Sequence, residues 1–367
     1  MRRRSTVTLL VVASVVIASA AAAAFMTVNT VLPDVPTRPP QFEVDPAWPK
    51  PLPNRWLMGQ ASGVAVDRHD HIWVVQRPKS LTDDEKGATL TPPRSMCCAP
   101  APAVLQFDVE GTLLASWGPV SGHPWPSNEH GIHVDHQDNV WLAGNGPKDG
   151  MILKFTKAGR HLLTIGTPGV VGDDTDTQHL NRPSNLVVDP QTNEVFVADG
   201  YANHRVIVFD GATGAYKRHW GANGRPPGDK SVKPFGNPVH CIRLSRDGLV
   251  YVCDRAHNRM QVFRKDGTFV KEFIVAPDTK GNGSLWDADL SPDAAQTFIH
   301  AADGENNVVW NLLRDTGRVL GSFGRNGRSA GQFHWIHNLA VDSKGNVYTT
   351  EVDSGKRAQK FVNKGRS

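Results

Sequence analysis

The sequence repeats one pattern six times: an alternating apolar stretch that ends in Asp or Ser, a tight polar turn, and a second alternating apolar stretch. The copies are SGVAVDRHDHIWVVQ, HGIHVDHQDNVWLAG, SNLVVDPQTNEVFVADG, HCIRLSRDGLVYVCD, WDADLSPDAAQTFIHAAD and HNLAVDSKGNVYTTE. Alternation with a period of two on both sides of a polar turn is typical of a β-hairpin. Since the repeat runs along most of the chain, it predicts an all-β repeat architecture.

A second pair of strand patterns follows most copies, as in VLQFDVEGTLLASWG and RVIVFDGATGAYKRHWG. Two successive hairpins make a four-stranded unit of roughly 40 to 60 residues, the length of one propeller blade. The sixth unit, from His337 to Phe361, is too short to supply a fourth strand. We expect the early segment QFEVDPAWP to complete this blade and close the ring. The prediction is a six-bladed β-propeller over residues 41–367, with an open β-sandwich array as the alternative.

The N-terminal residues predict export. MRRR is followed by STVTLLVVASVVIASAAAAAFMTV, an uncharged stretch long enough to cross a bilayer or to act as a signal sequence. We assign residues 1–30 to a signal peptide or membrane anchor and residues 31–40 to a Pro-rich linker. The arginines would stay in the cytoplasm, so the propeller is expected in the periplasm or outside the cell, tethered to the membrane if the leader is uncleaved. A buried core helix is the alternative interpretation of the apolar stretch.

The charge distribution gives no support to a nucleic-acid partner. The net charge is +4, but three of the positive residues lie in the leader and no dense Lys/Arg block follows it. We expect a monomer that takes a small molecule or a peptide.

The cysteines allow one cross-strand pairing. Cys241 and Cys253 flank the turn SRDG and would face one another across a hairpin, where an oxidising compartment would let them pair. Cys97 and Cys98 have no evident partner in the sequence.

Histidine recurs at one position of the repeat. Five residues before the Asp or Ser that ends the first strand, the six copies carry Ser62, His130, Ser184, His240, Trp286 and His337. The innermost strands of a propeller line its channel, so the three histidines would point at one axis, about 120° apart. Three imidazoles that leave a coordination position open are typical of catalytic zinc, while copper, iron and nickel also accept imidazole. Three unrelated histidines are the alternative.

The hairpins followed by DGYANHRVIVF and DRAHNRMQVF resemble NHL repeats. The chain from about residue 41 to its end is similar to the catalytic core of peptidyl-α-hydroxyglycine α-amidating lyase. This resemblance implies a six-bladed propeller that holds zinc in its channel through three histidines, which match His130, His240 and His337 one by one.

The same resemblance implies roles for three further residues. Tyr201 in DGYANHR corresponds to the catalytic tyrosine, and Arg77 in IWVVQRP corresponds to the catalytic arginine. Arg255 in VCDRAHNR corresponds to an arginine that contacts the substrate. Tyr201 would take the proton of a carbinolamide hydroxyl, and Arg77 would hold the carboxylate or the developing charge.

The chain departs from the family pattern in three respects. Asn338 follows His337 where the family has an aspartate that serves a structural calcium, so the resemblance does not carry calcium over. The insert at residues 79–102, which contains MCCAPAP, matches nothing in that core. No hydroxylase domain accompanies the lyase-like domain in this chain.

These features together predict an exported metal-dependent lyase that cleaves the C–N bond of a carbinolamide-type substrate, giving an amide and an aldehyde acid. A metal-dependent hydrolase that uses the same site is one alternative. A non-catalytic propeller that presents its blade loops to a protein or glycan partner is the other. Metal content and the effect of a chelator on turnover distinguish these functions.

Overall fold

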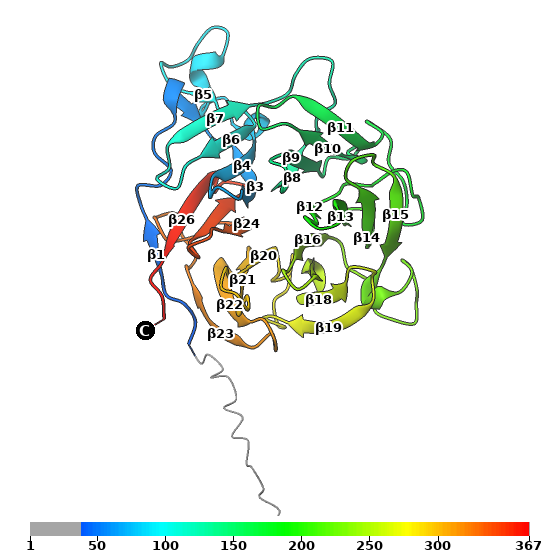
Figure 1. The fold of residues 1–367 in the computed structure, drawn as a ribbon. Helices are drawn as coiled ribbons and strands as arrows, with labels where there is room; N and C mark the ends of the chain where they lie inside the picture. The colour runs from blue at the N-terminus through cyan, green and yellow to red at the C-terminus, as the bar shows by residue number, and fades with distance from the viewer. Residues whose placement is uncertain (1–37, 367) are drawn as a thin grey trace, which may run out of the picture. The chain divides into compact units, whose positions relative to one another are not determined.

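The six repeated hairpins form the inner halves of six antiparallel four-stranded sheets, arranged as blades around a central axis (Figure 1). The computed structural model describes residues 38–366. The predicted all-β six-bladed propeller is confirmed, and the open sandwich array is wrong. No helix among the described residues is long and apolar enough to cross a membrane, and the predicted leader lies outside the described residues.

Each blade is a meander whose first strand lies next to the axis. The blades, from the inner strand outward, are as follows: β3 Gln60–Val66, β4 Ile72–Arg77, β6 Val104–Phe107 and β7 Leu113–Trp117; β8 Glu129–Val134, β9 Val140–Gly144, β10 Met151–Phe155 and β11 His161–Gly166; β12 Asn185–Val188, β13 Glu194–Asp199, β14 Arg205–Asp210 and β15 Tyr216–Trp220; β16 Val239–Leu244, β17 Leu249–Asp254, β18 Arg259–Arg264 and β19 Phe269–Ile274; β20 Asp287–Leu290, β21 Phe298–Asp303, β22 Val308–Leu313 and β23 Val319–Phe323; β24 Ile336–Val341, β25 Val347–Glu351, β26 Arg357–Asn363 and β1 Phe42–Asp45. The remaining elements are the parallel pair β2 Trp56–Leu57 and β5 Ala99–Pro100, and the 3₁₀ turns η1 Pro53–Arg55, η2 Pro78–Ser80, η3 Gly87–Thr89, η4 Ala222–Gly224 and η5 Arg255–His257.

The ring is closed by its two chain ends, as predicted. Strand β1 pairs antiparallel with β26, with Phe42 opposite Asn363, and so forms the outer edge of the last blade. Trp48, just beyond β1, is buried against the rings of Phe107 and Tyr348, whose centroids lie 5.7 and 5.1 Å away. The N-terminal segment therefore joins the last blade to the first.

Deleting residues 41–49 is expected to lower the melting temperature by about 10 °C or more. The deletion removes both the closing strand and a buried tryptophan, and loss of one such side chain alone costs about 3–5 kcal/mol. Glu43→Ala is the control, because this side chain is exposed in β1 and its removal leaves the strand in place. Equal melting of the deletion variant and the intact chain, by circular dichroism, would show that β1 does not hold the ring closed.

The Asp that ends the first strand of several repeats has a structural role. Three of these buried carboxylates accept a hydrogen bond from the aromatic side chain six residues later. The pairs are Asp67 with Trp73 (3.0 Å), Asp135 with Trp141 (2.8 Å) and Asp342 with Tyr348 (3.1 Å). The core itself lies between adjacent blades, as where Phe196 and Trp220 of one blade pack in one cluster with Phe263 of the next. The repeated carboxylate thus fixes an aromatic side chain within its own blade, and the apolar side chains of neighbouring blades pack between them.

Both pairs of cysteines are bonded. Cys241 and Cys253 lie opposite each other in β16 and β17, with Cα atoms 4.8 Å apart, and form the predicted disulfide. Cys97 and Cys98 are bonded to each other within the insert, a pairing that was not predicted.

Candidate metal centre

The three histidines of the repeat meet on the axis of the ring. His130, His240 and His337 each occupy the second position of an innermost strand, in β8, β16 and β24. The strand pairing shifts register at each of these positions, and such a bulge re-aims a side chain. Their ring centroids lie 4.7 to 5.0 Å apart, and one candidate ligand nitrogen from each lies within 4.8 Å of the others.

The residues that alternate with histidine around the ring fix the orientation of the imidazoles. Each histidine donates from Nδ1 to the backbone carbonyl at the equivalent position of the next blade. The pairs are His130 with Ser184 (2.7 Å), His240 with Trp286, and His337 with Ser62 (2.7 Å). Because a carbonyl oxygen can only accept, the proton sits on Nδ1 and the Nε2 lone pair is left free. Such carbonyl partners are typical of metal-binding histidines.

Electrostatics keep the three imidazoles neutral. Burial, together with nearby His337 and Arg77, holds the pKa of His130 well below its usual value. Burial and Arg255 do the same for the pKa of His240. Burial, reinforced by Arg77, lowers the pKa of His337 to about 3. All three are therefore unprotonated at Nε2 near neutral pH, the form that binds a metal.

The donor set fits a transition metal ion. The Tyr201 hydroxyl lies 2.9 Å from Nε2 of His130 and 3.1 Å from Nε2 of His240. A hydroxyl has one proton, so it can satisfy only one of these acceptors, and a buried acceptor without a donor costs free energy. A cation held by all three nitrogens would satisfy each of them, and imidazole suits zinc, copper, iron and nickel.

Tyr201 is positioned by the other residues of its motif. Asp199, at the end of β13, makes a fully buried ion pair with Arg205 at 2.9 Å and accepts from Asn203 at 2.8 Å. The backbone N–H of Tyr201 donates to the carbonyl of Arg182 at 3.2 Å. Asp199, Asn203 and Arg205 thus hold the DGYANHR loop in a shape that places the Tyr201 hydroxyl beside two of the ring histidines.

Both predicted arginines lie beside this centre. Arg77, at the end of β4, donates from Nε to the carbonyl of Glu129 and from Nη1 to the side-chain oxygen of Gln60, both at 2.8 Å. Burial lowers the pKa of Arg77. Arg255, in η5, lies 3.5 Å from the Tyr201 hydroxyl through Nη1.

A third arginine, Arg182, was not among the predicted site residues. Its guanidinium carbon lies 5.8 Å from the centroid of the Tyr201 ring, the same distance as that of Arg255. The only sequence signal is its place two residues before Ser184, a ring position of the repeat.

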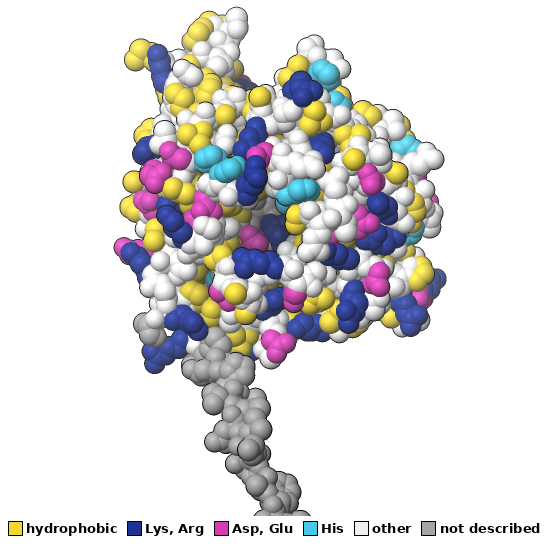
Figure 2. Space-filling model, in the orientation of Figure 1, with side chains coloured by type: hydrophobic (Ala, Val, Ile, Leu, Met, Phe, Trp, Pro, Cys, Tyr) yellow, Lys and Arg dark blue, Asp and Glu magenta, His cyan; other side chains and the backbone are white. Residues whose placement is uncertain are grey.

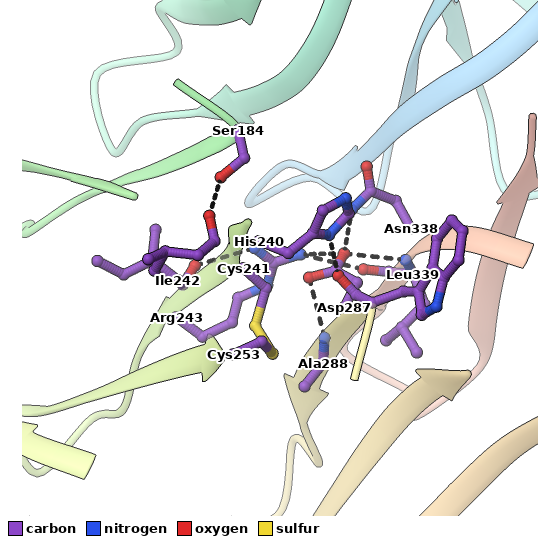
Figure 3. The surroundings of a disulfide bond; sticks show 12 residues. Ser184, His240, Cys241, Ile242, Arg243, Cys253, Asp287, Ala288, Asn338 and Leu339 are labelled. Atoms are coloured by element: carbon purple, nitrogen blue, oxygen red, sulfur yellow. Dashed lines mark hydrogen bonds and ion pairs between the residues drawn. A yellow bond between two sulfur atoms is a disulfide. The ribbon is translucent and has the colours of Figure 1, made fainter. Parts of the chain in front are cut away.

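Asn338, the residue after His337, takes part in a second cluster of polar side chains with Asp287 and Arg243 (Figure 3). Asn338 donates to Oδ2 of Asp287 at 2.7 Å, and Arg243 donates to the same oxygen at 2.7 Å. Arg243 also donates to the carbonyl of Leu339 at 3.2 Å. Burial raises the pKa of Asp287 to about 6, so its charge requires a partner. The guanidinium of Arg243 supplies a cation at this carboxylate, beside Asn338, where the resemblance does not carry calcium over.

Arg243→Met is expected to destabilise the fold by about 3–5 kcal/mol, because it leaves Asp287 buried without its cation. A calcium-selective chelator is expected to leave the melting temperature of the wild-type protein unchanged. Arg264→Met is the control, since Arg264 is exposed at the end of β18. Thermal unfolding with and without chelator measures both, and a marked loss of wild-type stability in chelator would contradict the role given to Arg243.

The chain is similar to several known proteins. The NHL repeat family model matches residues 180–209 and 239–263. NHL repeat-containing protein 3 of Mus musculus is 27% identical over 344 residues, covering 88% of this chain and 84% of that protein. Peptidyl-alpha-hydroxyglycine alpha-amidating lyase 1 of Drosophila melanogaster is 27% identical over 280 residues, covering 70% of this chain and 49% of that protein. The match thus spans about half the length of that lyase.

Among solved structures, one described as "Streptogramin B lyase structure" aligns with a TM-score of 0.54 at 12% identity, covering 88% of this chain and 97% of that chain. This likeness supports the fold alone. The chain carries NHL repeats on a six-bladed propeller and is related at low identity to proteins named as amidating lyases.

Proposed function

We propose that this protein is a metal-dependent lyase of the peptidyl-α-hydroxyglycine α-amidating type. The observation that carries the proposal is the convergence of three neutral imidazole Nε2 atoms with the Tyr201 hydroxyl. A catalytic metal needs ligands with a position left open, and a proton transfer needs an acceptor at that position. Three imidazole ligands would leave a coordination position for a substrate oxygen, and the Tyr201 hydroxyl, 2.9 Å from Nε2 of His130, supports a proton transfer there.

A divalent ion on the three imidazoles would serve as a Lewis acid toward a substrate oxygen. The rest of the chemistry belongs to side chains of the chain. The Tyr201 oxygen, as a phenolate, accepts the proton of the carbinolamide hydroxyl, the electrons of that O–H bond form a carbonyl, and the C–N bond breaks. Tyr201 returns the proton to the departing amide nitrogen, so the products are a primary amide and an aldehyde acid. The guanidinium of Arg255, 3.5 Å from the Tyr201 oxygen, stabilises the phenolate charge that this oxygen carries before the first transfer and after the second.

Arg77 has a positioning task in this scheme. Its Nε and Nη1 are held by Glu129 and Gln60, which leaves Nη2 for the carboxylate of the substrate. A guanidinium fixed on one edge presents its remaining N–H groups in a defined direction. The substrate would thus be held at its carboxylate while its hydroxyl faces Tyr201.

The test uses the purified full-length chain with benzoyl-α-hydroxyglycine as substrate. Release of the aldehyde acid is followed before chelation, after chelation, and after zinc is added back. The proposal predicts turnover that disappears on chelation and returns with metal. Turnover of esters without turnover of the carbinolamide would favour a hydrolase, and bound metal with no turnover of either would favour a binding propeller.

A further inference from the structure

Three arginines near Tyr201 lack an acidic ion-pair partner among the described residues. Arg77, Arg182 and Arg255 come from three different blades or their connecting loops. Within residues 38–366, none of the three forms an ion pair, although Arg205 and Arg259, the two buried arginines besides Arg255, both do. Uncompensated guanidinium groups at one place attract an anion.

Neutral groups hold each of these arginines in place. Arg182 donates from Nε to the backbone carbonyl of Asn145 at 2.8 Å. Arg255 stacks on Trp286, with its guanidinium carbon 4.3 Å from the ring centroid, and its buried Nε has no hydrogen-bond partner in the described part of the chain. Carbonyls and aromatic faces orient a guanidinium but leave its full charge in place.

The nearby carboxyl groups do not cancel this charge. Glu129 and Asp353 attract Arg77 from beyond ion-pair distance. The carboxyl of Glu129 already accepts from the indole of Trp125 at 2.7 Å, and burial raises its pKa. The positive charge is therefore left for a ligand.

Arg182 is held in an unfavourable backbone conformation. Its φ of 59° lies in the left-handed region, which glycine and asparagine adopt more readily than arginine. A long cationic side chain at such a position is retained at a cost, and such strain is commonest at functional sites. The conformation places the Arg182 carbonyl on the Tyr201 N–H and its guanidinium near the Tyr201 ring.

We propose that the substrate is a dianion: an acyl-α-hydroxyglycine whose acyl group bears a second carboxylate, with Arg182 as the residue that selects it. This inference rests on the proposed function. The α-hydroxyglycine carboxylate binds Nη2 of Arg77, Arg255 stays beside the Tyr201 oxygen, and the second carboxylate binds the free Nη groups of Arg182. The guanidinium carbon of Arg182 lies 5.8 Å from the centroid of the Tyr201 ring, and the substrate hydroxyl faces the oxygen of the same ring. A short acyl chain spans such a gap.

The test compares two substrates of equal size, succinyl-α-hydroxyglycine and its ω-amide, which differ by one charge. The wild-type kcat/KM is expected to favour the dianion by about 10- to 100-fold, the range of a paired charge-assisted hydrogen bond. Arg182→Gln is expected to bring this ratio close to one, mainly by raising KM for the dianion. Arg264→Gln, which removes an exposed arginine at the end of β18, is the matched control and should keep the ratio. Arg182→Asn, which suits the left-handed backbone, replaces the glutamine variant if that variant does not fold.

Calorimetry separates this inference from the proposed function. Succinylglycine and its ω-amide have no hydroxyl to react, so their binding does not depend on turnover. Tighter binding of succinylglycine by the wild-type protein, lost in Arg182→Gln, supports the dianion site. If no carbinolamide is cleaved in the same preparation, the proposed lyase function is wrong but the dianion site stands. Equal binding of the two compounds by the wild-type protein overturns the dianion site, even if the carbinolamide is turned over.

Discussion

Replacing His240 by alanine is expected to lower the metal content of the purified protein at least about tenfold and to abolish turnover. The variant leaves two imidazoles, and within the described residues the only group of three or more candidate ligands consists of His130, His240 and His337. A three-ligand site has no spare donor to replace the lost nitrogen. The equivalent substitutions at His130 and His337 are expected to give the same result, because all three stand at one register position.

A buried histidine outside the ring provides the matched control. His300, in β21, is buried and bonds to the side chain of Asn311 at 2.7 Å, so His300→Ala should cost stability yet leave the metal content unchanged. Metal is measured by plasma mass spectrometry per mole of folded protein. Full metal content in all three ring variants would show that these histidines do not form a metal site.

The position of the histidines could be predicted because it depends only on register. Side chains alternate along a strand, so a residue that stands at the same point in each repeat reaches the same height in the channel. The ring closure followed from the same counting, since the last unit lacked a strand and the segment at residues 41–49 had no partner. Neither inference needs knowledge of how one blade packs on the next.

The features that were missed all depend on contacts between distant segments. The carbonyl of Ser184 that holds His130 lies 54 residues away in sequence, and the Asp287 carboxylate lies 44 residues from Arg243. Arg182 joins the site because its loop meets the loop of Tyr201, which no local pattern encodes. Close packing determines which side chains of adjacent blades meet. The period of a single repeat carries no information about these contacts.

Tyr201→Phe is expected to separate chemistry from metal binding. The substitution keeps the ring, which packs near Arg182 and Arg255, and removes only the hydroxyl that lies 2.9 Å from His130. The three Nε2 lone pairs then have no protein donor there, so the metal should be retained. Turnover is expected to fall by about 10² to 10⁴, the usual contribution of a general base.

The control for this variant is Tyr216→Phe, which removes an exposed hydroxyl that bonds to His219 in β15. Both variants are compared with the wild type for metal content, melting temperature and release of the aldehyde acid from benzoyl-α-hydroxyglycine. Because the phenyl ring fills the same volume, a lower kcat at unchanged metal content assigns the defect to the missing proton acceptor rather than to a disturbed site. Undiminished turnover in Tyr201→Phe would remove the tyrosine from the reaction while leaving the histidine site intact, and loss of metal together with activity would make the hydroxyl a part of the metal centre.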